Sequence, residues 1–180
     1  MYGKGAQTWQ IAPYDNKWVY FANNNGMVQF DGNVWSIFPL KNSSDVRSVL
    51  PSATQKRIYV GGINEFGYYN PKADGSLDYH CMSDTLDASI KLLGNVWGIH
   101  EVDNILYFQG DSRVVKYSNG KYTAIEIDAK IDCSNMVNGI LYIGTDKGVW
   151  FLVGNTFFPL QGGDILTSKR IRGIIPYKKG

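Results

Sequence analysis

Residues 140–152 read ILYIGTDKGVWFL, and this stretch decides the fold because three other segments repeat its pattern. They are WVYFANNNGMVQF at 18–30, RIYVGGINEFGYY at 57–69 and ILYFQGDSRVVKY at 105–117. Each copy has a tyrosine between two apolar residues, and another large side chain stands ten residues after that tyrosine. The residues between them are rich in Gly, Asn and Asp, which tolerate the positive φ angles of tight turns. Each segment therefore predicts a β-hairpin.

Two further extended stretches flank each hairpin. Those before it are WQIAP (9–13), RSVLP (47–51), VWGIH (96–100) and SNMVN (134–138); those after it are WSIFPL (35–40), LDYHCM (77–82), YTAIEI (122–127) and TFFPL (156–160). The repeated tyrosines, Tyr20, Tyr59, Tyr107 and Tyr142, are 39, 48 and 35 residues apart. Four-stranded units that recur every ~40 to 50 residues are typical of β-propeller blades. We predict an all-β fold, a β-propeller fragment with about four four-stranded antiparallel blades.

The repeat places these blades at 1–42, 43–84, 85–130 and 131–168. Residues 169–180 are predicted to form the inner strand of a truncated fifth blade, because 172–176 match the inner-strand pattern of 47–51. An insertion at 83–94 is expected in a surface loop. Since an open arc leaves apolar blade faces in water, we expect either a piece of a larger propeller or a dimer whose two chains complete a ring.

Composition excludes several classes of partner. The chain has 180 residues, 44% of them apolar, and a net charge of 18 − 16 = +2, which predicts a folded protein without a nucleic-acid-binding surface. Five basic residues near the C-terminus are interrupted by apolar residues, and we interpret them as part of a solvated loop and chain end: Lys169, Arg170, Arg172, Lys178 and Lys179. The longest apolar runs have five residues, so we expect membrane attachment only through a segment outside this sequence.

The residue types that usually carry catalysis are sparse. Cys81 and Cys133 are 52 residues apart and are read as two buried free thiols, and His80 and His100 are read as structural. No metal, phosphate or dinucleotide motif is present, so no cofactor, metal or catalytic residue is predicted and the protein is read as a non-enzyme. A pair of carboxylates acting on glycosides stays open, because that mechanism needs only two acids at a set separation.

The candidate binding residues lie in the hairpin turns. In an antiparallel blade, the turn between the second and third strands and the connection to the next blade emerge on one face, called here the loop face. Polar side chains from all four turns are predicted to gather there and to hydrogen-bond a small hydroxylated ligand: Asn24, Asn25, Asn64, Glu65, Arg113, Asp146 and Lys147, with Asn23, Asp111 and Ser112 beside them. Ordinary turn chemistry is the alternative explanation for the same residues.

Two sets of residues carry a resemblance to known families. LYIGTDKGVWFL at 141–152 resembles the two-component regulator propeller repeat. QTWQI, VYFANNNGMVQFDGNVW, VRSV and IYVGGINEFGYYNPKADGSLDY, in this order, are similar to the N-terminal sensor propeller of Bacteroidetes membrane-bound transcriptional regulators. The resemblance implies a periplasmic sensor, in a receptor that carries a triple-tyrosine domain, a membrane span and a histidine kinase or LuxR-type output. It also implies a carbohydrate signal, but identifies no ligand-contact residue.

Two functions follow as expectations. The favoured one is a sensor module that recognises a ligand outside the cytoplasm and relays the signal through a membrane segment. The alternative is a secreted propeller hydrolase, lyase or lectin acting on glycans, for which Tyr68, Tyr69 and Trp97 are candidate stacking residues.

Overall fold

Residues 7–72 and 74–177 are described by a computed structural model, in which four antiparallel sheets of four strands follow one another along the chain. Blade 1 contains β1 (Thr8–Tyr14), β2 (Trp18–Asn23), β3 (Gly26–Phe30) and β4 (Trp35–Phe38). Blade 2 contains β5 (Ser48–Ser52), β6 (Arg57–Gly61), β7 (Phe66–Pro71) and β8 (Leu77–Cys81). Blade 3 contains β9 (Gly98–Val102), β10 (Ile105–Gln109), β11 (Arg113–Ser118) and β12 (Lys121–Glu126). Blade 4 contains β13 (Ile131–Val137), β14 (Ile140–Thr145), β15 (Gly148–Val153) and β16 (Thr156–Pro159).

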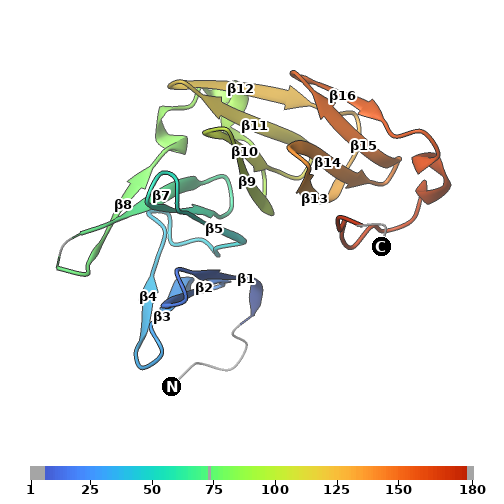
Figure 1. Ribbon diagram of the computed structural model, residues 1–180. Coiled ribbons are helices and arrows are strands. Elements are labelled where there is room, and N and C mark those ends of the chain that lie inside the picture. Colours follow the sequence, from blue (N-terminus) through green and yellow to red (C-terminus); the bar gives the residue numbers. More distant parts are fainter. Residues whose placement is uncertain (1–6, 73, 178–180) are drawn as a thin grey trace.

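Every sheet keeps its strands in sequence order. Figure 1 shows the first strand of each sheet facing a common centre, while β4, β8, β12 and β16 lie toward the outside. The predicted all-β propeller of four antiparallel four-stranded blades is therefore confirmed. The short helices η1 (Ser83–Thr85), α1 (Ala88–Lys91) and η2 (Gly163–Leu166) lie in connections, and no helix within the described ranges is long and apolar enough to cross a membrane.

The repeated tyrosines show how the blades are joined. Tyr20 lies in the buried cluster between blades 1 and 2, Tyr59 in the one between blades 2 and 3, and Tyr107 in the one between blades 3 and 4. The residue after each tyrosine points the other way, as strand alternation requires, so Val60 packs toward blade 1 and Phe108 toward blade 2. One side of a blade thus carries the tyrosine, and the next blade covers it.

The first and last blades each keep one uncovered side. Tyr142 is only half-buried, and its ring lies beside Phe151, with centroids 6.1 Å apart. On blade 1 the half-buried Phe21 contacts Trp35, with centroids 5.4 Å apart, and Trp35 is 50% exposed. Within the described residues, no buried cluster joins blade 4 to blade 1. The four blades form an open arc.

The insertion before blade 3 differs from the expected surface loop. Residues 83–94 contain η1 and α1, and Leu86 and Leu93 from this segment are buried with Met82 in the cluster between blades 2 and 3. The segment therefore contributes to the core, because its leucines cover apolar surface that the strands alone leave open.

The predicted fifth inner strand is an extended segment without strand pairing. Residues 171–177 form no strand, because an inner strand takes its ladder from the second strand of its own blade, and no such strand lies among the described residues. The segment nevertheless lies beside β13: Ile171 N donates to Asp132 Oδ2 (3.2 Å), and Asn135 Nδ2 donates to Ile174 O (2.7 Å). It occupies the place of a following inner strand. Residues 178–180 lie outside the described residues.

Candidate functional site

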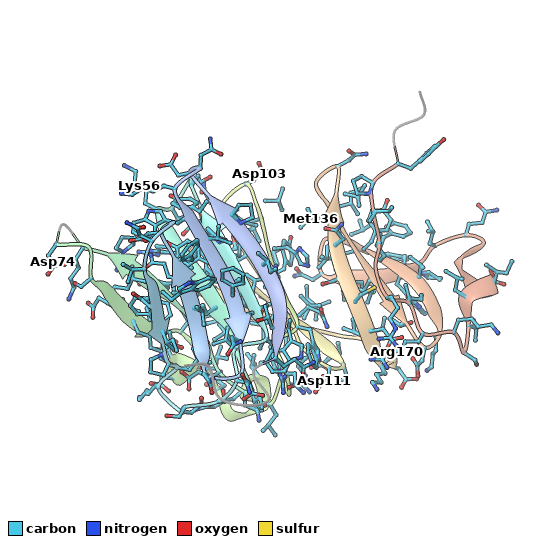
Figure 2. All side chains as sticks on the ribbon, turned by 90° about the horizontal axis from the view of Figure 1, so that it is seen from below. Lys56, Asp74, Asp103, Asp111, Met136 and Arg170 are labelled. Atoms are coloured by element: carbon cyan, nitrogen blue, oxygen red, sulfur yellow. The ribbon has the colours of Figure 1, made fainter. Side chains whose placement is uncertain are left out.

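The two ends of the blades present different faces. Figure 2 shows Lys56, Asp103 and Met136 toward one face and Asp111 and Arg170 toward the other. Asp111 belongs to the turn between β10 and β11, and Arg170 follows blade 4. The second face is therefore the predicted loop face, formed by the β-hairpin turns and by the connections between blades.

A pocket of about 910 Å³ opens on the loop face where blades 3 and 4 meet. Its lining comes from the entry to blade 3, the connection from blade 3 to blade 4 with the start of β13, the hairpin turns of both blades, and the segment after blade 4. The lining residues used below are Asn95, Trp97, Asp111, Asp128, Lys130, Asp132, Asp146, Lys147 and Arg170. We call this the loop-face pocket.

Trp97 is the aromatic residue of this pocket, and its indole is held from two sides. Its Nε1 donates to Asp111 Oδ1 (2.9 Å), and the Arg47 guanidinium lies 5.1 Å from its ring centroid. Arg47 also stacks on Trp9 at 3.8 Å, and its Nε donates to Asn95 Oδ1 (3.1 Å). Cation–π contact and a charge-assisted hydrogen bond fix the ring, and the residue is 37% exposed. The result is a pre-oriented aromatic surface.

The register of the blades explains why these side chains meet. In each blade the second residue after the repeated tyrosine pairs with an inner-strand residue: Gln10, Ser48, Gly98 and Cys133. The residue that precedes this inner-strand partner in the sequence occupies the same position in all four blades. It lies at the loop-face end of the inner strand. These four positions hold Trp9, Arg47, Trp97 and Asp132. Aromatic and charged side chains thus follow one another around the centre of the arc.

The polar part of the loop-face pocket carries both charge signs. Lys147 Nζ pairs with Asp128 Oδ2 (2.8 Å), and Asp146 Oδ1 accepts from Lys130 N (3.0 Å). The adjacent Lys147 holds the pKa of the Asp128 carboxyl below its usual value. Four carboxylates and three cationic side chains line the pocket, so no strong field of one sign results. Such a lining suits a neutral ligand rich in hydroxyl groups, which both donate and accept.

The structure separates the predicted site residues. Asp146 and Lys147 line the loop-face pocket, together with Asp111 and Ser112. Asn24, Asn25, Asn64, Glu65 and Arg113 do not line it. The predicted ring of contacts is therefore concentrated between blades 3 and 4, and a ligand role for any of these residues stays a prediction.

A repeated loop contact accounts for several of the others. The residue four after the repeated tyrosine accepts a hydrogen bond from the backbone that enters or precedes its blade: Asn24 Oδ1 from Gln7 N (3.3 Å), Asp111 Oδ2 from Asn95 N (3.1 Å), Asp146 Oδ1 from Lys130 N. Asn64 Oδ1 similarly accepts from Gly94 N (2.8 Å). These side chains close the loops, as Asn and Asp do in turns.

Glu65 performs this task in blade 2, where Ile63 occupies the equivalent position. Its carboxylate accepts from Lys41 N (2.8 Å), Asn42 N (3.0 Å) and the Tyr79 hydroxyl (2.9 Å), and the residue is 5% exposed. Burial and the Glu65 carboxylate raise the pKa of Tyr79, so its hydroxyl keeps its proton. Glu65 is thus bound by protein groups on both oxygens.

The remaining candidates lie elsewhere. Arg113 pairs with Glu126 (3.3 Å). Tyr69 is buried and donates its hydroxyl to Pro39 O (2.8 Å), whereas Tyr68 stacks on His80 at 5.0 Å. Tyr69 therefore packs in the core and Tyr68 on the blade surface. Of the three candidate stacking residues, Trp97 lines the loop-face pocket.

The histidines and cysteines fit structural roles. His100 Nε2 contacts Ser134 Oγ (2.7 Å) between blades 3 and 4, and the serine in turn contacts Gln109 Oε1 (3.0 Å). Burial lowers the pKa of His100 to about 4. Both cysteines are free, as predicted, but half-buried rather than buried. Burial raises the pKa of Cys133, which keeps it a thiol.

Sequence reasoning placed the blade connections on the loop face but named no candidate residue from them. Asp128 and Lys130, from the connection between blades 3 and 4, Asp132, at the start of β13, and Arg170, after blade 4, all line the loop-face pocket. The antiparallel topology was the signal that could have added them to the candidates, because it brings these segments to the same face as the hairpin turns.

No protein-family model and no curated protein matches the chain. Among solved structures, the chain is similar to the extracellular domain of a protein described as a hybrid two-component system of B. thetaiotaomicron, with a TM-score of 0.66, 12% identity and coverage of 92% of this chain and 24% of that one. A second such domain from the same organism has a TM-score of 0.64 and 16% identity, and the match covers 84% of this chain and 23% of that one. Catalytically inactive virginiamycin B lyase from Staphylococcus aureus, in a structure with quinupristin, has a TM-score of 0.63 and 13% identity, and the match covers 91% of this chain and 59% of that one.

The fold therefore defines the chain as four consecutive blades of a β-propeller. It shares this architecture with the extracellular domains of the two-component systems, of whose length it spans about a quarter, and with the lyase. At these identities the likeness shows the fold.

Proposed function

We propose that the chain is the ligand-recognition module of an extracytoplasmic, periplasmic sensor, and that its loop-face pocket binds a small carbohydrate. The observation that carries the proposal is the pre-oriented Trp97 indole beside polar groups of both signs. Sugar rings stack their C–H faces on aromatic surfaces, and their hydroxyls pair with carboxylates and cationic side chains. The architecture shared with extracellular domains of two-component systems supports the same assignment.

In this proposal the chain supplies recognition alone. A membrane segment and a kinase or DNA-binding output would belong to other parts of the receptor, so this segment makes no direct contact with nucleic acid. A ligand shifts the receptor only by binding one arrangement of its domains better than another. The loop-face pocket lies between two blades, so an occupied pocket bears on their connection as well as on the ligand.

The test is binding of neutral oligosaccharides by calorimetry, with maltotriose, xylotriose and galactotriose as probes. Trp97→Ala removes the stacking surface and should weaken binding by about tenfold or more. Trp35→Ala is the matched control, because Trp35 is 50% exposed on the uncovered side of blade 1. Absence of binding to all three sugars, or equal weakening by both substitutions, would contradict the proposal.

A glycan-active enzyme is the alternative, favoured by the four carboxylates of the loop-face pocket. Two of them have a more specific task in the fold, since Asp111 binds Trp97 Nε1 and Asn95 N, and Asp132 binds Ile171 N. Reducing-sugar release from the same oligosaccharides separates the two functions: a sensor binds without turnover, whereas turnover that Asp128→Asn abolishes would establish the enzyme.

A further inference from the structure

A second pocket lies on the face opposite the loop face, between blades 1 and 2. Its volume is about 690 Å³, and its lining comes from strands β1, β2 and β3, the β1–β2 turn, the β5–β6 turn and the β7–β8 connection. The residues used below are Tyr14, Asp15, Lys17, Trp18, Tyr20, Gln29, Lys56 and Lys72. We call it the aromatic pocket; the proposal made above does not involve it.

Two buried polar side chains lie in the lining of the aromatic pocket. Gln29 is 7% exposed and Tyr20 is 2% exposed, and Gln29 Nε2 donates to the Tyr20 hydroxyl oxygen (3.1 Å). The two side chains are thus paired with each other, and neither belongs to the buried side-chain atoms that lack a partner among the described residues. Both line the pocket, so Gln29 Oε1 can accept from a ligand group and the Tyr20 hydroxyl can donate to it.

The Tyr20 hydroxyl is suited to donate. Burial raises its pKa above the ordinary value, and the nearby Tyr14 adds to the increase. The hydroxyl therefore keeps its proton at neutral pH. A sugar hydroxyl both accepts and donates, which matches the Tyr20 hydroxyl and Gln29 Oε1 together.

The sides of the pocket are aromatic. The ring of Tyr14 lies 6.4 Å from that of Tyr20, and the half-buried Trp18 carries the Lys17 ammonium 4.8 Å above its ring. Both Tyr14 and Trp18 pack against the cluster between blades 1 and 2, which restricts their movement. They offer fixed aromatic surface to a ring.

The rim of the pocket is positively charged. Lys17, Lys56 and Lys72 line it against the single carboxylate of Asp15, a local balance of 3 − 1 = +2. Lys72 has a distant partner in Asp78 (3.8 Å), and all three lysines are exposed. Ammonium groups gathered at the mouth of a polar and aromatic pocket attract an anionic group.

We propose that the aromatic pocket is a binding site for an acidic sugar, a pyranose that bears a carboxylate or a sulfate. Its hydroxyl pairs with Tyr20 and Gln29, its ring contacts Tyr14 and Trp18, and its acidic group meets Lys17 and Lys56. Uronates and sulfated sugars share this chemistry, and the probes below distinguish them.

The test titrates the protein with galacturonic acid, galactose 6-sulfate and galactose, followed by NMR. We expect one or both acidic sugars to bind at least about tenfold more tightly than galactose, and binding to weaken as salt is raised. The acid that binds more tightly identifies the source of the anion. Absence of binding by both acids, or equal binding of galactose, would overturn the proposal.

Variants locate the site. The pair Lys17→Ala with Lys56→Ala should weaken acidic-sugar binding about tenfold without unfolding, since both side chains are exposed. Gln29→Met conserves volume and removes the buried acceptor, so it should also weaken binding. Lys121→Ala, at an exposed lysine of β12 that lines neither pocket, should leave it unchanged. Unchanged binding in the double lysine variant, or loss in Lys121→Ala, refutes the assignment; Trp97→Ala tests the loop-face pocket separately.

Discussion

The indole of Trp97 is hydrogen-bonded to the carboxylate of Asp111, with Nε1 and Oδ1 2.9 Å apart. The same carboxylate accepts from Asn95 N through its other oxygen (3.1 Å). One side chain therefore connects the hairpin turn of blade 3 to the segment that enters blade 3, and it orients the exposed aromatic ring. Asp111 therefore closes this loop and also orients the aromatic ring that the proposed sugar site uses.

Asp111→Ala should release Trp97 and lower stability. The Trp97 Nε1–H and Asn95 N–H groups lose their acceptors, so we expect a destabilisation of about 2 kcal/mol and weaker binding of neutral sugar. Asp111→Asn retains one acceptor and should have a smaller effect on both. The indole N–H resonance of Trp97 reports the contact directly in NMR. If that resonance stays in place in Asp111→Ala, the hydrogen bond does not orient the ring.

Glu65→Ala should destabilise the chain more than any exposed carboxylate. Its two oxygens accept from two backbone N–H groups and from Tyr79, and these donors would be left partly buried without partners. We expect a loss of about 2–4 kcal/mol in urea unfolding. Asp128→Ala is the matched control, because Asp128 is a fully exposed member of an ion pair and its removal should leave the midpoint unchanged. Similar midpoints for both variants would contradict the structural role of Glu65.

The repeat made the fold predictable. The tyrosines at positions 20, 59 and 107 specify strands that turn one side toward the next blade. The turns between the strands have residue types that strongly favour tight hairpins. Residues 83–94 lay outside the repeat, so nothing in their local pattern indicated that Leu86 and Leu93 would be buried by contacts distant in sequence.

The face on which the loop-face pocket opens follows from the sequence, but the residues that line the pocket do not. Topology places the hairpin turns and the blade connections on one face, yet turn residues such as Asn24 and Asp146 have the same residue types whether they close a loop or contact a ligand. Only the geometry of their partners separates these roles. Trp97 was recognisable as a candidate, whereas Gln29 gave no signal, because its place in the lining of the aromatic pocket is visible only once the fold is known.

His100 should make stability depend on pH. Its pKa is lowered to about 4 in the folded protein, against about 6.5 when unfolded, because burial disfavours the charged imidazole. Between these values the unfolded chain binds more protons, so stability is complete above about pH 6.5 and falls as the pH drops toward 4, by about 3 kcal/mol at most. His100→Asn places there the residue type of the equivalent Asn135 and should flatten this dependence in urea titrations. His80→Asn is the control and should leave the pH dependence of stability unchanged. If His80→Asn flattened this dependence and His100→Asn did not, His100 would not be its source.

Equivalent tyrosines should differ in their contribution to stability. Tyr107 is 8% exposed in the cluster between blades 3 and 4, so Tyr107→Ala should cost about 3–5 kcal/mol. Tyr142 holds the same repeat position on the uncovered side of blade 4, where truncation should cost only about 1 kcal/mol. Thermal and urea unfolding of the two variants measure the contrast at dilute protein. Equal losses would mean that another surface covers Tyr142.

The two uncovered sides predict self-association. Blades 2, 3 and 4 each pack one side against the tyrosine side of the blade before them. The equivalent side of blade 1 carries Phe21 and Trp35 and is uncovered. The tyrosine side of blade 4 can accept it from a second copy, and two such contacts would close a ring by two-fold symmetry. We expect sedimentation to show a dimer that Trp35→Asp or Phe158→Asp converts to monomer, because each places a charge in the contact. Val34→Asp is the control at an exposed position in the β3–β4 turn. A monomer at every concentration would show that neither side is covered by a second copy.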